Sequence, residues 1–94
     1  MLVLSVAKAA GNTLLWTFNR AVTSNGVASP QLQDATLSSS GNPIATAQTG
    51  ANAVTCTYSA TPATGHTWQI SSTPTNLTDS AGVGIKVPQS GTVV

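Results

Sequence analysis

The chain has 94 residues, 40% of them hydrophobic, and a net charge of +1, so its composition fits a single domain over residues 1–94 with one core. Only five side chains are charged (Lys8, Arg20, Asp34, Asp79 and Lys86), whereas an ordinary soluble domain has about a quarter of its residues charged. Because the cations lie far apart in the sequence and no segment approaches the roughly 20 apolar residues that cross a bilayer, neither nucleic acid nor membrane is an expected partner.

Short alternations of apolar and polar residues predict β-strands along the whole chain, and no window shows the apolar spacing of an amphipathic helix. Turn-forming pairs such as Gly11-Asn12 and Asn25-Gly26 recur every 8–12 residues or so, which is typical of a sandwich or barrel. In chain order, about seven strands are expected, at residues 2–6, 13–18, 31–37, 44–48, 54–58, 66–71 and 85–87.

Three of these segments are expected to supply the core, because their alternation places large apolar side chains on one face and polar side chains on the other. The predicted inward residues are Leu14, Trp16 and Phe18 in the second strand, Val54, Cys56 and Tyr58 in the fifth, and Trp68 and Ile70 in the sixth. Cys56 is therefore expected to behave as a small hydrophobic side chain.

Two parts of the chain resemble the immunoglobulin-like modules of bacterial surface-layer proteins, adhesins and phage virion proteins. Residues 11–22 (GNTLLWTFNRAV) look like the strand and turn that open such modules. Residues 52–58, 62–70 and 77–82 follow the order of their last strands, with a glycine turn, an aromatic-bearing strand and an aspartate loop. The resemblance implies an immunoglobulin-like β-sandwich of about seven strands.

No catalytic, cofactor or metal site is expected from these residues. His66 follows Gly65 at a strand start, where an exposed side chain is expected, and Asp34 is expected to pair with a lysine or lie in solvent. Asp79 is expected to cap its own loop through an Asx turn. Because Val83 stands where the resembled modules often carry asparagine, the resemblance implies no cation site in that loop.

The resemblance, together with the scarcity of charge, predicts a non-enzymatic structural protein, a small phage virion component such as a capsid decoration or tail-surface subunit. Sheet edges are usually protected by charge or proline, and this chain has few residues for that purpose. Its expected partners are other virion or assembly subunits, in an oligomeric context, and its expected place is the virion, after synthesis in the host cytoplasm. The apolar ending 91–94 would add a strand to a neighbour or lie along its own sheet.

The alternative is a glycan- or cell-surface-binding module of adhesin type at the bacterial surface. Its binding surface would come from loops at one end of the sandwich, and Trp68 would contribute if its ring were exposed. The candidate surface residues in those loops are Asn25, Gly26, Asn76 and Asp79.

Overall fold

The computed structural model describes all 94 residues and contains nine strands and one short 3₁₀ helix. The all-β fold class predicted from the sequence is confirmed, and the sheets form a small sandwich. The immunoglobulin-like type of that sandwich stays a prediction. The elements are β1 (Val3–Lys8), β2 (Thr13–Phe18), β3 (Thr23–Ser24), β4 (Gln33–Asp34), η1 (Ala35–Ser40), β5 (Ala45–Gly50), β6 (Ala53–Thr57), β7 (Thr67–Ile70), β8 (Leu77–Thr78) and β9 (Gln89–Thr92).

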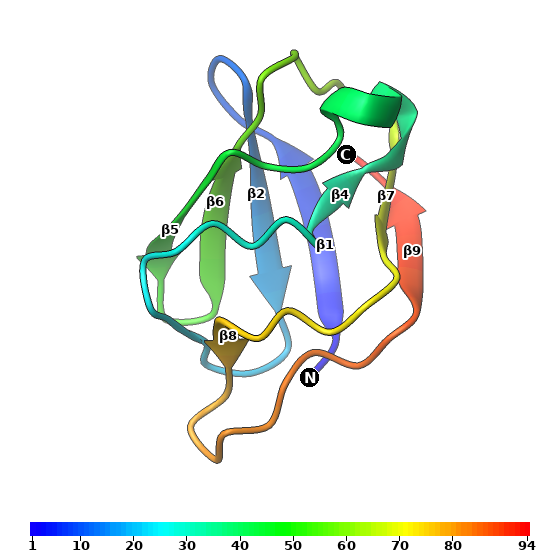
Figure 1. Cartoon of the computed structure of the whole chain (residues 1–94). Helices are drawn as coiled ribbons and strands as arrows, with labels where there is room; N and C mark the ends of the chain where they lie inside the picture. The colour runs from blue at the N-terminus through cyan, green and yellow to red at the C-terminus, as the bar shows by residue number, and fades with distance from the viewer.

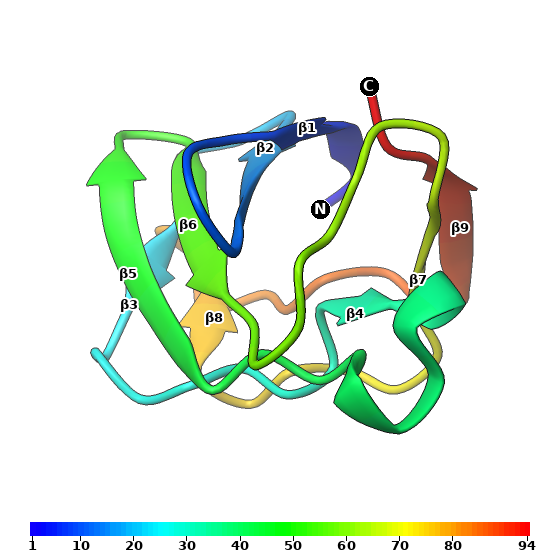
Figure 2. The ribbon, with the colours of Figure 1, turned by 90° about the horizontal axis from the view of Figure 1, so that it is seen from above.

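The strands form three antiparallel sheets (Figure 1). The largest sheet has the order β1-β2-β6-β5, the second has the order β4-β7-β9, and β3 pairs with β8 alone. Viewed from above, the two larger sheets lie on opposite sides of the core (Figure 2). The fold is therefore two layers of strands closed over one interior.

The inward faces of β2 and β6 build the middle of the core. Antiparallel register places Trp16 opposite Val54 and Leu14 opposite Cys56, and all four side chains are fully buried. The Trp16 ring meets the ring of Trp68 from the other sheet in a T-shaped contact, with 5.5 Å between centroids and 71° between planes, a favourable aromatic geometry. The predicted inward residues are confirmed. The buried hydrophobic core consists of Val6, Leu14, Trp16, Phe18, Val22, Leu32, Val54, Cys56, Tyr58, Trp68, Ile70, Leu77, Ile85 and Val93.

The C-terminal segment lies along its own sheets. Strand β9 pairs with β7, and beyond it the Val94 N–H donates to the Val6 carbonyl at 2.9 Å. The Lys8 N–H in turn donates to the Val94 carbonyl at 2.8 Å. Of the two alternatives for residues 91–94, the intramolecular one is correct, and this segment covers part of the outer edge of β1.

The strand predicted at 31–37 is wrong for most of its length. Only Gln33–Asp34 is strand, and η1 follows at once. The Asp34 carboxylate accepts the Thr36 N–H at 3.0 Å, which turns the chain out of the extended conformation. The alternation of apolar and polar residues does not reveal a capping hydrogen bond formed by a buried aspartate, so the helix could not be predicted from it.

The strand predicted at 85–87 is also wrong, because the last strand runs over Gln89–Thr92. Ile85 is buried from a loop instead. The true strand, Gln-Ser-Gly-Thr, carries no apolar alternation and forms by pairing with β7. Its glycine lies opposite Trp68, where an added Cβ would stand 2.8 Å from the indole ring.

Candidate functional site

Strand β5 forms an open edge of the four-stranded sheet. It pairs only with β6, and no other backbone–backbone hydrogen bond reaches residues 45–49. The Thr46 and Gln48 side chains bond to the backbone of residues 22–29, and they leave the outward N–H and C=O groups of β5 without a backbone partner. Within its six residues, Ala-Thr-Ala-Gln-Thr-Gly, there is neither a charge nor a proline. Unpaired N–H and C=O groups on such an edge are a template for another strand.

The other sheet edges are short or covered. The outer edge of β1 bonds to Val94, and its Val3 N–H donates to the Gln89 side chain at 2.9 Å. Strand β4 has only two residues, and β9, the other edge of that sheet, has four. This leaves β5 as the longest edge of the fold with free backbone groups.

The outer face of the four-stranded sheet continues the uncharged surface from this edge. Because register partners share a face, the outward side chains can be read from the strand pairing. They are small or hydroxyl-bearing apart from one leucine, and Thr49 bonds to Thr55 between hydroxyl oxygens 3.0 Å apart. Two rows of this face are Thr13, Thr57 and Ala45, and Ala7, Leu15, Thr55 and Ala47.

The candidate loop residues Asn25, Gly26 and Asn76 lie together. The Asn25 N–H donates to the Asn76 carbonyl at 3.4 Å, and Gly26 takes a positive φ of 81°. The Asn76 side-chain amide donates to the carbonyls of residues 27–28 at 2.8 and 2.7 Å, while its oxygen accepts the Ser29 hydroxyl at 2.7 Å. These polar groups hold one loop against the other.

Asp79, the fourth candidate, caps its own loop. Its Oδ1 accepts the Ala81 and Val83 N–H groups, each at 2.9 Å, so the expected Asx turn is confirmed. The Val83 N–H is the main group that holds the pKa of Asp79 below its ordinary value of 3.8. The Ala81 N–H and the nearby Arg20 guanidinium act in the same direction, and burial opposes them.

Asp34, which is buried, and His66, which is partly buried, form a pair that the sequence did not predict. The Asp34 side chain is fully buried, and its Oδ2 lies 2.7 Å from His66 Nδ1. The expectations of a solvent-exposed or lysine-paired Asp34 and an exposed His66 are therefore wrong. Pairing of β4 with β7 brings residues 32 positions apart together, and no spacing signal could have revealed this.

The Asp34–His66 pair helps to connect η1 to the sheet that contains β7. Asp34 also caps η1 through the Thr36 N–H, and the Thr36 hydroxyl accepts the Thr67 N–H at 2.9 Å. No hydroxyl or thiol bonds to the second nitrogen of His66, and no three His, Cys, Asp or Glu side chains gather anywhere in the chain. The geometry joins η1 to β7 and presents no activated nucleophile.

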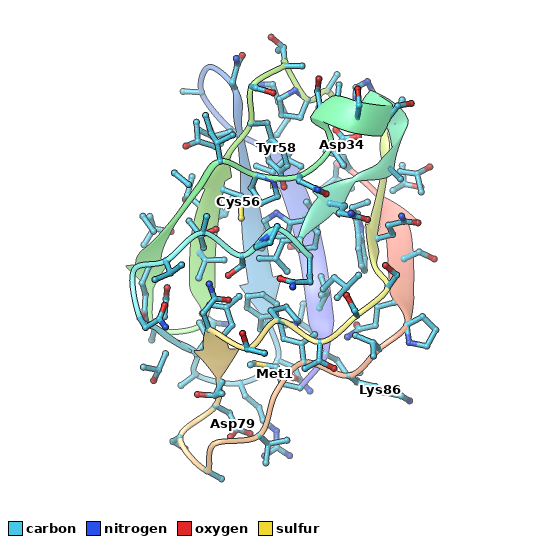
Figure 3. The ribbon with its side chains drawn as sticks, in the orientation of Figure 1. Met1, Asp34, Cys56, Tyr58, Asp79 and Lys86 are labelled. Atoms are coloured by element: carbon cyan, nitrogen blue, oxygen red, sulfur yellow. The ribbon has the colours of Figure 1, made fainter.

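The thiol of Cys56 and the phenol of Tyr58 lie in the interior (Figure 3). Burial raises the pKa of Cys56 to about 12, so its thiol stays protonated and unreactive at neutral pH. Burial likewise raises the pKa of Tyr58, whose hydroxyl donates to the Leu32 carbonyl at 2.7 Å and accepts the Trp16 indole N–H at 3.2 Å. The prediction that Cys56 packs as a small core side chain is confirmed.

All four aromatic side chains are in the core, with Trp68 the most exposed at 7%. The prediction that both tryptophans pack inside is confirmed. The only helix, η1, has six residues, and no helix of this chain could cross a membrane.

The fold and its surfaces define a small all-β sandwich with one open, uncharged edge. No protein-family model, curated protein or solved structure matches this chain.

Proposed function

We propose that this chain is a non-enzymatic structural subunit that joins an assembly through the β5 edge and the uncharged outer face beside it. The observation that carries the proposal is the six-residue edge without charge or proline. Soluble sheet proteins usually block such an edge against other chains. We therefore expect a partner chain to cover the β5 edge in the assembled state.

Pairing at this edge needs little beyond backbone hydrogen bonds. An added antiparallel strand would bond to the free N–H and C=O groups of β5, and two copies related by a twofold axis supply the same groups to each other. The exposed side chains of Ala45 and Ala47 leave room for close approach. No like charges oppose one another there.

Within this class, the proposal is a small phage virion component, a capsid decoration or tail-surface subunit presenting an immunoglobulin-like domain. The resemblance of residues 11–22, 52–58, 62–70 and 77–82 to virion and surface-layer modules supports this assignment. The partners would be other virion or assembly subunits, and the site of action the virion. The same scaffold serves several roles, so the assembly edge supports the structural class more directly than the virion assignment.

The alternative, a glycan- or cell-surface-binding module, has less support from the surface. Sugar rings stack on exposed aromatic side chains, and here every aromatic ring is buried. The amide of Asn76 is bonded within its own loops.

The experiment introduces charge at the edge. The double variant Ala45→Lys/Ala47→Lys should abolish both self-association, measured by analytical ultracentrifugation, and co-sedimentation with virions, because lysine blocks strand addition. The matched control, Ser71→Lys/Ser72→Lys, adds the same charge at two exposed loop positions and should behave like the unmodified chain. A wild-type chain that stays monomeric and never co-sediments with virions would contradict the proposal.

A further inference from the structure

Three of the five charged side chains of this protein gather at one cleft, although Arg20 lies far in the sequence from the other two. Arg20, Asp79 and Lys86 line this cleft, which has a volume of about 450 Å³. Figure 3 shows Asp79 and Lys86 at the same end of the molecule as Met1. A volume of this size lies within the range of pockets that bind ligands.

The cleft walls come from three parts of the chain that are bonded together. The Leu2 N–H donates to the Asn19 side chain at 2.8 Å, and the Asn19 N–H donates to the Leu2 carbonyl at 2.9 Å. The Lys86 N–H donates to the Met1 carbonyl at 3.0 Å. The Asx turn of Asp79 fixes the third wall. The cleft is therefore formed before any ligand arrives.

The cationic side chains in the cleft have unused hydrogen-bond donors. Lys86 Nζ makes no hydrogen bond or ion pair, and the Arg20 guanidinium, 65% exposed, lies 3.9 Å from Asp79, beyond hydrogen-bond distance. Asp79 is the sole acidic side chain lining the cleft, and two N–H groups already occupy its Oδ1. The lining side chains therefore carry one excess positive charge.

Apolar side chains stand beside these cations. Leu2 is 44% exposed and Val83 is 55% exposed, and both line the cleft. Exposed apolar groups next to unpaired cations match a ligand that carries an anion on an apolar body.

We propose that this cleft binds an acidic peptide segment of another protein, whose carboxylate bonds to Arg20 and Lys86 while its apolar neighbours pack on Leu2 and Val83. The positions of the two acidic side chains argue against a second copy as the occupant and favour a different partner. In a second copy, Asp34 is fully buried and Asp79 lies in the cleft itself, so neither acidic side chain can serve as the ligand. This cleft is a separate surface from the β5 edge, and its ligand is independent of the assembly proposed there.

The test measures binding of a fluorescein-labelled peptide of alternating leucine and glutamate by fluorescence anisotropy at low salt. Arg20→Gln and Lys86→Gln should each weaken binding about fivefold, because each removes one charge-assisted bond at a partly exposed site. Lys8→Gln is the matched control, since it removes the same charge outside the cleft and should change the affinity less than about twofold. Circular dichroism confirms that each variant is folded.

A gain in affinity separates the proposal from damage to the fold. Asp79→Asn removes the carboxylate that competes for Arg20 but keeps an oxygen for the Ala81 and Val83 N–H groups. This variant should bind the acidic peptide about twofold more tightly or better.

Three results would overturn the proposal. The first is equal binding of the same peptide with glutamine in place of glutamate, and the second is equal loss of affinity in Lys8→Gln and Lys86→Gln. The third is a competition experiment in which sodium octanoate displaces the labelled peptide as effectively as the unlabelled peptide does. That result would assign the cleft to a small carboxylate instead.

Discussion

Replacement of Tyr58 by phenylalanine tests how the core satisfies its buried polar groups. The Tyr58 hydroxyl donates to the Leu32 carbonyl at 2.7 Å and accepts the Trp16 indole N–H at 3.2 Å. All three residues are 0–1% exposed, so water cannot replace the hydroxyl without a rearrangement. Tyr58→Phe therefore leaves one buried acceptor and one buried donor without a partner.

The expected loss follows from these two groups. An unsatisfied buried group costs about 1–3 kcal/mol, and the longer indole bond belongs at the low end, so a total of about 2–4 kcal/mol is expected. A domain of this size is stable by only about 5–15 kcal/mol, so the loss is a large fraction of the total. At about 5 °C per kcal/mol, Tm should fall by about 10–20 °C.

The assay is equilibrium urea unfolding followed by tryptophan fluorescence and by circular dichroism. Thr57→Val serves as the control. Thr57 precedes Tyr58 in the sequence and lies on the outer face of the sheet, and its hydroxyl makes no hydrogen bond. It should stay within about 0.5 kcal/mol of the unmodified chain. A Tyr58→Phe loss as small as that of the control would refute the reasoning.

Three further predictions concern single residues. Gly41→Ala should destabilise the fold by about 3 kcal/mol or more, because the added Cβ would stand 2.2 Å from the Asp34 carbonyl oxygen. In the control Gly50→Ala, the added Cβ meets no atom closer than 3.4 Å, so thermal unfolding should show a much smaller loss of stability. Cys56 should resist a thiol reagent such as DTNB at neutral pH until urea unfolds the chain, and rapid native-state labelling would contradict its burial and raised pKa of about 12. The pKa of Asp79 in the folded chain is below 3.8, so its stabilising effect is present above pH 3.8 and is lost as the pH falls through the folded pKa. The difference in unfolding free energy between the unmodified chain and Asp79→Asn should therefore shrink in acid. A difference that does not change with pH would argue against this role.

The three strong strands were predictable because their signal is local. Alternation over 13–18, 53–57 and 67–70 directs every second side chain into the interior whatever the neighbouring strands are. The burial of Cys56 and of both tryptophans follows from the same period. The turn of Asp79 is equally local, because its partners lie two and four residues away.

Strands that depend on distant partners were predicted poorly. Residues 89–92 have no apolar alternation, and they become β9 only because β7 offers backbone groups across the sheet. Asp34 and His66 were expected near solvent because charged and polar side chains usually lie there. The burial of Asp34 is stabilised by its contact with the partly exposed His66, 32 positions away, and the spacing of the sequence does not show that contact.

The sequence by itself determined the all-β class, the inward faces of the core strands and the scarcity of charge, because composition and a two-residue period are properties of the chain alone. The tertiary structure decided where that scarcity matters. Strand order left β5 uncharged and open at an edge, and chain folding gathered Arg20, Asp79 and Lys86 at one cleft. Edges and clefts are made by segments distant in sequence, so only the folded chain specifies them.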